Sequence, residues 1–307
     1  MLLEALKIQN LLPCFKISGI DRFSVSKIFD CGQCFRFNLV ENSIHEVEYS
    51  GVAFGRFVSF AQDGDTLYIY NATEEDYENI WKHYLSLDND YSAIENDIVS
   101  RCANKSLLNA IEFSKGIRIL NQDKWEAVCS FIISQNNNIP RIKKIIEALS
   151  KRCGKKIELP FVAESHLSRF NEYYSFPTPE AILELGVEGL TELRTGFRAK
   201  YIYDAAQKIT DGTIDLNSID SLTTEEAIKY LCAIKGIGPK VASCALLFAF
   251  EKYDAFPIDV WIKKVISKYF DCEDPDRFDS KSLGLYAGIA QQFLFYYERY
   301  GGYKKYE

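Results

Sequence analysis

The chain contains no long hydrophobic run, although hydrophobic residues make up 47% of its 307 residues. A membrane-spanning helix needs roughly 18 or more consecutive apolar residues, and no stretch approaches that length. The segment MLLEALKIQN at the start also lacks the basic region and long apolar run of a secretory signal. We therefore expect neither a membrane span nor secretion, and a cytoplasmic location, or a nucleoid-associated one in a prokaryote.

The chain also lacks an excess of positive charge. Its 36 Lys and Arg residues face 43 Asp and Glu residues, which gives a net charge of -7. This balance argues against a protein that coats nucleic acid through bulk charge. Residues 230–268 differ, because they hold six lysines and three acidic residues, a local balance of +3. Such a charge distribution indicates a protein that makes only a few contacts with nucleic-acid phosphates, through its basic segment.

Cysteine pairs that would build a metal cluster or a disulfide framework are missing. The nine cysteines are odd in number and scattered, which favours free thiols in a reducing compartment. CGQC at 31–34 is a CxxC motif, but no second CxxC and no nearby histidine completes four zinc ligands. We also expect it at a strand edge, not at the helix start where a redox motif lies. Cys272 is the only cysteine after Cys244, too few for a four-cysteine iron–sulfur cluster.

Short runs of alternating apolar and polar residues are present from Asp21 to Asn71, for example FGRFVSF at 54–60. Thr73 to Asp76 then forms a capping box that opens a helix. The rest of the chain reads as helices joined by short loops. The sequence therefore predicts an α+β fold, with a β-rich domain containing an antiparallel sheet over residues 1–118 and a helical domain over residues 119–307.

A helical hairpin is predicted at about 224–250. A capping box from Thr223 to Glu226 starts its first helix, and the GIG turn with Gly236 and Gly238 separates it from a second helix that begins at Pro239. The turn needs positive φ or close backbone approach, which glycine allows. Backbone N–H groups at the start of the second helix are then free to hold a phosphate oxygen.

Two polar residues near this hairpin suggest chemistry. Lys240 lies in the first turn of the second helix, where a cation is mildly unfavourable. The helix start and desolvation favour the neutral amine, which can attack an electrophilic carbon. Asp259 precedes an apolar-striped helix, so it fits the N-cap position. On residue pattern alone, Asp259 could be only a cap.

GIGPKVASC, followed by PIDV at 257–260, resembles the helix-hairpin-helix DNA glycosylase superfamily, and within it the 8-oxoguanine DNA glycosylase/AP lyases. The resemblance spans roughly Phe23 to Phe295. It implies an active site in the cleft between the two domains, a duplex DNA substrate containing 8-oxoguanine, and a monomer. It also implies that Lys240 forms a Schiff base with the sugar, that Asp259 stabilises the cationic sugar, and that the strand is cleaved by β-elimination. Neither a redox cofactor nor a catalytic metal is implied.

The resemblance also assigns the base pocket. CGQCFRF implies that the main-chain carbonyl of Gly32 accepts a hydrogen bond from N7 of the lesion, which carries a hydrogen that guanine lacks. In AGIAQQFLFYYERY, Gln291 meets the Watson–Crick edge and Phe295 stacks on the base, with Cys244 on the opposite face. Gln291 and Phe295 are four residues apart and would share a helix face. Without the resemblance, this stretch is an aromatic-rich amphipathic helix.

SQNNNIPR implies that Asn136 and Arg141 contact the cytosine left behind by flipping, and TGFRAK implies that Phe197 is the wedge and Arg198 a second cytosine contact. An aromatic wedge fills the stacking gap of an extruded base. The plain alternatives are cap and turn chemistry for the asparagines, and a core phenylalanine with a solvated arginine.

One position departs from the family, since PIDVW places Trp261 where a histidine usually contacts the DNA backbone. Further residues are implied only by the resemblance. The expected phosphate contacts are Gly236, Gly238, Val241 and Trp261, and the carbonyls of Cys232, Ile234 and Ile237 could hold a structural cation.

Two other functions stay open on the sequence. One is a related bifunctional glycosylase of the endonuclease III kind that acts on oxidised pyrimidines, although its usual iron–sulfur cysteines are missing. The other is a non-enzymatic DNA-binding module that uses the hairpin as a phosphate clamp. That module would leave Lys240, Asp259, Gly32 and Gln291 unexplained.

Overall fold

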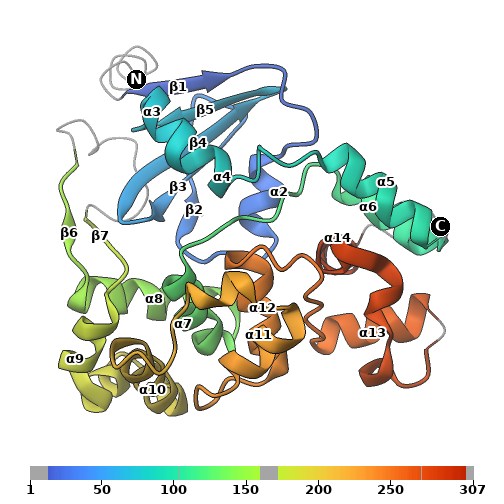
Figure 1. The fold of residues 1–307 in the computed structure, drawn as a ribbon. Coiled ribbons are helices and arrows are strands. Elements are labelled where there is room, and N and C mark those ends of the chain that lie inside the picture. The colour runs from blue at the N-terminus through green and yellow to red at the C-terminus, as the bar shows by residue number, and fades with distance from the viewer. Residues whose placement is uncertain (1–12, 103, 160–171, 271, 302–307) are drawn as a thin grey trace.

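The computed structural model describes residues 13–102, 104–159, 172–270 and 272–301, and every structural statement below refers to these residues. An N-terminal sheet lies at one end of the molecule, and the helices form a larger body beneath it (Figure 1). The predicted α+β fold is therefore confirmed. No helix in the described ranges is long and apolar enough to cross a membrane.

The sheet has five antiparallel strands in the order β1-β5-β4-β3-β2. β3 and β4 pair from Val47 opposite Gln62 to Ala53 opposite Arg56, and the Asp63–Thr66 pair closes the next hairpin. The alternating pattern predicted these hairpins, while β1 precedes the predicted stretch. The strands are β1 (Cys14–Ile17), β2 (Phe37–Leu39), β3 (Val47–Ala53), β4 (Arg56–Asp63) and β5 (Thr66–Tyr70).

An aromatic core fills the space between the sheet and the helices that cover it. Phe29 stacks on Phe60 with ring centroids 5.3 Å apart, and Trp81 meets Phe60 edge-on at 5.6 Å. The predicted capping box is present, because the Thr73 side chain accepts from the Asp76 N–H and the Asp76 carboxylate accepts from the Thr73 N–H. The covering helices are α2 (Val25–Asp30), α3 (Glu74–Asp76), the π-helical turn η1 (Tyr77–Trp81) and α4 (Lys82–Tyr84).

The helical body is built around α7 and α12, which are buried from Ala127 to Ile133 and from Val241 to Ala249. Side chains cap several of these helices, for example that of Asp123, which accepts from the N–H of Glu126. The body comprises α7 (Lys124–Ser134), α8 (Ile139–Cys153), α9 (Pro179–Glu192), η2 (Gly196–Arg198), α10 (Ala199–Thr210), η3 (Ser218–Ser221), α11 (Thr224–Leu231), α12 (Pro239–Ala249), α13 (Val260–Tyr269), η4 (Pro275–Arg277), η5 (Ser280–Tyr286) and α14 (Ala287–Tyr300), with a small two-stranded ribbon of β6 (Lys156–Ile157) and β7 (Tyr173–Tyr174).

Two helices of the N-terminal half pack with this body. α6 (Lys105–Ser114) lies beside α14 (Figure 1), and α5 (Tyr91–Arg101) packs against α6 and η5. Their buried residues Ile98, Leu107 and Ala110 belong to the same hydrophobic core as the helical body. Packing therefore groups α5 and α6 with the helices, and the division at residue 118 remains a prediction from the sequence.

Candidate active site

A cavity of about 370 Å³ opens between the turn after α2 and the helical body, where the cleft was expected. Its walls come from the CGQC turn, the loop from α7 to α8, and the starts of α12 and α13, with α14 as the remaining wall. It collects residues that are far apart in the sequence. The predicted site residues that line it are Gly32, Lys240, Cys244, Asp259, Trp261, Gln291 and Phe295.

The CGQC turn follows α2 and precedes β2, so the expected setting at a strand edge was wrong. Gly32 has φ +82°, a conformation that side chains disfavour. A Cβ added to Gly32 would lie 3.9 Å from Cε1 of Phe295 and 3.4 Å from Cδ1 of Ile139. Gly32 therefore brings main chain against the ring that was predicted to stack on the base.

The helical hairpin forms as predicted, with the Thr223 capping box at the start of α11 and Pro239 as the first residue of α12. Its two glycines have different roles. Gly236 has φ +82°, and a Cβ there would lie 2.2 Å from the Tyr201 ring. Gly238 is extended at φ -102°, and a Cβ there would meet nothing within 4 Å. Gly236 is thus required by the fold, whereas Gly238 leaves the start of α12 open.

Lys240 is exposed at the rim of the cavity, while every later residue of α12 is buried. The desolvation expected for it is therefore absent in the free protein and would have to come from a bound ligand. Lys240 interacts with Cys244. Burial raises the pKa of the Cys244 thiol, and the positive charge of Lys240 offsets part of that rise. Cys244 is consequently a neutral thiol suited to packing against a ring.

Asp259 is both the N-cap of a helix and a residue that lines the cavity. Its Oδ1 accepts a hydrogen bond of 2.8 Å from the N–H of Ile262, which makes it the N-cap of α13. The same residue is only partly buried and lines the cavity together with Lys240. The cap fixes where the carboxylate stands, and the cavity gives it access to a ligand.

Gln291 carries an unpaired acceptor in this cavity. The residue is 5% exposed, and within the described chain its Oε1 is buried with no hydrogen-bond partner. Leaving such an acceptor unpaired costs about 1–3 kcal/mol. A ligand with an N–H donor would satisfy it. Phe295, one helical turn later, stands next to it on the same helix face.

The residues predicted to face the opposite strand gather outside the cavity, where two loops meet. Asn136 is exposed with φ +46°, and Phe197 is 51% exposed. Arg141 is exposed and donates to the carbonyl of Arg194 at 3.4 Å. Exposed aromatic and polar groups in one place fit a surface that contacts a base pair.

Arg198 stands differently from its neighbours. It is 3% exposed, and its guanidinium donates to the carbonyls of Gln135 at 2.8 Å and Asn136 at 3.0 Å. The same group lies 4.4 Å from the centre of the Phe197 ring. Arg198 therefore holds the asparagine loop and packs against Phe197, and a direct contact with a base would need these hydrogen bonds to change.

Trp261 is 44% exposed at the cavity rim, and the amine of Lys264 lies 4.8 Å from its ring centre. Other lining residues were not predicted from the sequence. Arg299 has its guanidinium 5.8 Å from the Phe295 ring centre, and a four-residue spacing on a helix could have indicated it. The other lining residues that the sequence did not single out are Cys31, Phe35, Phe131, Ser134, Asn137, Asn138, Ile139, Ile142, Phe248, Pro257 and Gln292.

In the described parts of the chain, no group of three or more His, Cys, Asp or Glu side chains is arranged to hold a metal ion. A cation site made of the carbonyls of Cys232, Ile234 and Ile237 would use other ligands. The Ile234 carbonyl accepts from the N–H of Ile237 at 3.1 Å within the hairpin. That site stays a prediction.

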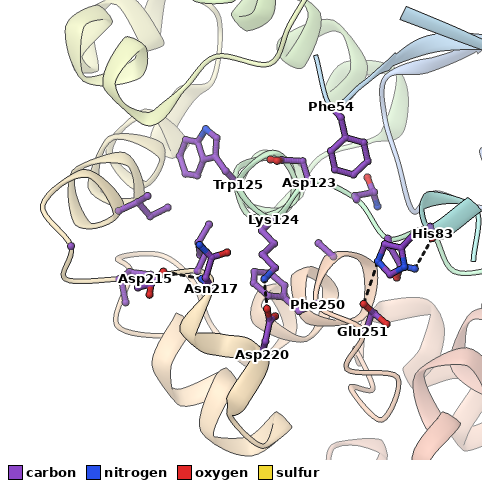
Figure 2. A pocket seen from close by; sticks show the side chains of 17 residues that line it. Phe54, His83, Asp123, Lys124, Trp125, Asp215, Asn217, Asp220, Phe250 and Glu251 are labelled. Atoms are coloured by element: carbon purple, nitrogen blue, oxygen red, sulfur yellow. Dashed lines mark hydrogen bonds and ion pairs between the residues drawn. The ribbon is translucent and has the colours of Figure 1, made fainter. Parts of the chain in front are cut away.

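A larger hollow of about 780 Å³ lies at the other end of α7 and contains none of the predicted site residues (Figure 2). Four of its titratable side chains form two pairs. Lys124 meets Asp220 at 2.6 Å, and His83 meets Glu251 at 3.3 Å. Cavity size alone therefore does not identify the candidate active site. Gln291, with its unpaired acceptor, and Lys240, with its amine, line the smaller cavity of about 370 Å³.

Comparison with known families agrees with this geometry. Residues 129–282 match the family described as HhH-GPD superfamily base excision DNA repair protein. Residues 17–128 match the 8-oxoguanine DNA glycosylase, N-terminal domain. The chain belongs to the helix-hairpin-helix base excision DNA repair superfamily, and its N-terminal half carries the domain of the 8-oxoguanine glycosylases. The family predicted from the sequence is confirmed.

Relatives cover most of the chain. MBOgg1, solved in complex with a low-affinity DNA ligand, is 41% identical with a TM-score of 0.85, over 94% of this chain and 96% of that one. The 8-oxoguanine glycosylase/lyase of Clostridium acetobutylicum, in complex with double-stranded DNA containing cytosine opposite 8-oxoG, is 37% identical with a TM-score of 0.83, over 95% and 98%. A probable N-glycosylase/DNA lyase of Methanothermobacter thermautotrophicus is 26% identical over 231 residues, 67% of this chain and 71% of that protein.

Proposed function

We propose that the chain excises 8-oxoguanine from duplex DNA and then cleaves the strand at the resulting abasic site. The observation that carries this proposal is the single cavity in which the amine of Lys240, the carboxylate of Asp259 and the unpaired Oε1 of Gln291 meet. We also propose a monomer as the active form. Since the substrate is genomic DNA, the enzyme works where the chromosome is, in agreement with the expected cytoplasmic or nucleoid location.

The lesion is selected by its hydrogen at N7. The Gly32 carbonyl accepts from that N–H, whereas guanine would place a lone pair against the carbonyl. This difference amounts to about 1–3 kcal/mol for a buried group. Gln291 Oε1 accepts from an N–H on the Watson–Crick edge of the base, and Phe295 and Cys244 enclose its two faces.

The proposed chemistry combines nucleophilic attack by Lys240 with proton transfers and a β-elimination. The neutral amine of Lys240 attacks C1′, and the C1′–N9 bond breaks with its electron pair leaving on the base. The ring then opens to a protonated Schiff base. Loss of a proton from C2′ breaks the C3′–O bond and cleaves the strand on the 3′ side. The Asp259 carboxylate stabilises the positive charge that develops on the sugar.

No step changes an oxidation state, so the proposal includes no redox cofactor. Lys240 supplies the nucleophile and Asp259 the stabilising charge, so the proposed steps use no catalytic metal. Phe197 fills the stacking gap left by the flipped base. Asn136 and Arg141 meet the orphaned cytosine, and Arg198 holds their loop. A structural cation at the hairpin carbonyls remains part of the proposal.

The start of α12 is proposed to bind a DNA phosphate, and Gly238→Val tests this. Its backbone is extended and its surroundings are open, so the fold should survive. We expect affinity for lesion and undamaged duplex to fall alike, by roughly 10- to 100-fold, the size of one charge-assisted hydrogen bond. The slope of log K against log salt should be modest, about -2 to -5. Undiminished binding to undamaged duplex would show that the hairpin is not the anchor.

Gly236→Val is the matched control, because its Cβ would overlap the Tyr201 ring. Its effect should appear first as a lower melting temperature.

The function itself is tested on duplexes that carry 8-oxoguanine, thymine glycol or no lesion. We expect excision and strand cleavage of the 8-oxoguanine duplex only. Preferential cleavage of thymine glycol would assign the chain to the oxidised-pyrimidine enzymes, and binding to all three without cleavage would make it a DNA-binding module.

A further inference from the structure

Buried glutamines hold the turn that contains Gly32. Gln292 is 3% exposed, and its Nε2 donates to the carbonyl of Cys31 at 3.0 Å. Consecutive residues on a helix point about 100° apart. Gln291 can therefore line the cavity while the side chain of Gln292 reaches the adjacent turn from the same helix.

Gln33 holds the other side of the turn and is fully buried. Its Nε2 donates to the carbonyls of Ile28 at 3.0 Å and Arg118 at 2.9 Å, and its Oε1 accepts from the N–H of Leu120 at 2.8 Å. Its own carbonyl accepts from Nε2 of Gln122 at 2.8 Å. The residues before and after Gly32 are thus both tied down by glutamine side chains.

The two peptide units around Gly32 determine where its carbonyl points. The buried Cys31 thiol donates to the Ile28 carbonyl at 3.2 Å and accepts from Nε2 of Gln33 at 3.3 Å, so the residues on both sides of Gly32 are also tied to each other. The Gly32 carbonyl lies between these two fixed residues, on a residue that lines the cavity.

We propose that Gln292 is a positioning residue for lesion recognition, which rests on the proposed function of the Gly32 carbonyl. Glycine has no side chain to restrict its dihedral angles, so its carbonyl direction depends on the neighbouring peptide units. Gln292 fixes the Cys31–Gly32 unit through the Cys31 carbonyl. Without that bond, the unit can rotate and the Gly32 carbonyl no longer keeps the direction that meets N7–H.

Gln292→Met tests this, because methionine matches the length of glutamine and has no donor. We expect single-turnover excision of 8-oxoguanine to fall roughly 5- to 30-fold, the range of one hydrogen bond. Cleavage of a preformed abasic site should stay at the wild-type rate, since that substrate has no base to read. Gln292→Asn, whose shorter side chain cannot reach the carbonyl, gives the same comparison if the methionine variant does not fold.

Ser114→Ala is the matched control, because buried Ser114 donates to the carbonyl of Phe293 on the same helix at 3.0 Å. It should lower the melting temperature and leave the ratio of excision to abasic-site cleavage unchanged. A ratio that is equally unchanged in Gln292→Met would overturn the proposal and leave Gln292 a structural residue. Failure of the wild-type protein to excise 8-oxoguanine would instead contradict the proposed function.

Discussion

Lys240→Gln is expected to reduce strand cleavage on 8-oxoguanine DNA by roughly 10³-fold or more, because an amide nitrogen cannot attack C1′ or form a Schiff base. The fold should be unaffected, since Lys240 is exposed. Removing a cation from the first turn of α12 is even slightly favourable for the helix. The loss should therefore appear in chemistry and not in the melting temperature.

The matched control for this variant is Lys235→Gln. Lys235 is exposed on the same hairpin but does not line the cavity, so the change removes the same charge without touching the site. Single-turnover cleavage and duplex affinity are measured for both variants. Wild-type cleavage by Lys240→Gln would show that another group is the nucleophile.

Asp259→Asn is expected to slow base excision by about 10²-fold or more while the protein keeps its stability. Asparagine caps a helix about as well as aspartate, so the bond to the N–H of Ile262 can be retained. What is lost is the negative charge that stabilises the cationic sugar. The substitution therefore separates the charge of Asp259 from its role as a cap.

Asp90→Asn provides the control for the cap. Asp90 caps α5 through the N–H of Ala93 at 3.0 Å and lies outside the cavity. Both variants should unfold near the wild-type temperature, and only Asp259→Asn should change single-turnover excision. If excision by Asp259→Asn is unchanged, Asp259 is a helix cap and nothing more.

Local signals in the sequence predicted the helix starts well, because an unpaired helix end needs a partner within a few residues. The capping boxes at Thr73 and Thr223 and the cap at Asp259 form as expected. The alternating strands were also predictable, since one face of a sheet must be buried. The family motifs then indicated seven of the residues that line the cavity.

Long-range contacts set the limit of such prediction. Gly236 and Gly238 look equivalent in the sequence, but only Gly236 packs against Tyr201, a residue of another helix. Arg198 was expected to face DNA, and its burial depends on carbonyls from a loop some sixty residues earlier. Gln292 is two hundred and sixty-one residues from its partner Cys31. Residues so far apart in the sequence show no local pattern that would indicate their contact.

The most direct test of the account is borohydride trapping of the wild-type protein on duplex DNA with 8-oxoguanine opposite cytosine, followed by mapping of the cross-linked peptide. We predict a covalent complex that depends on the lesion, with the sugar attached to Nζ of Lys240. Attachment at any other residue, or strand cleavage without a trapped complex, would contradict the account.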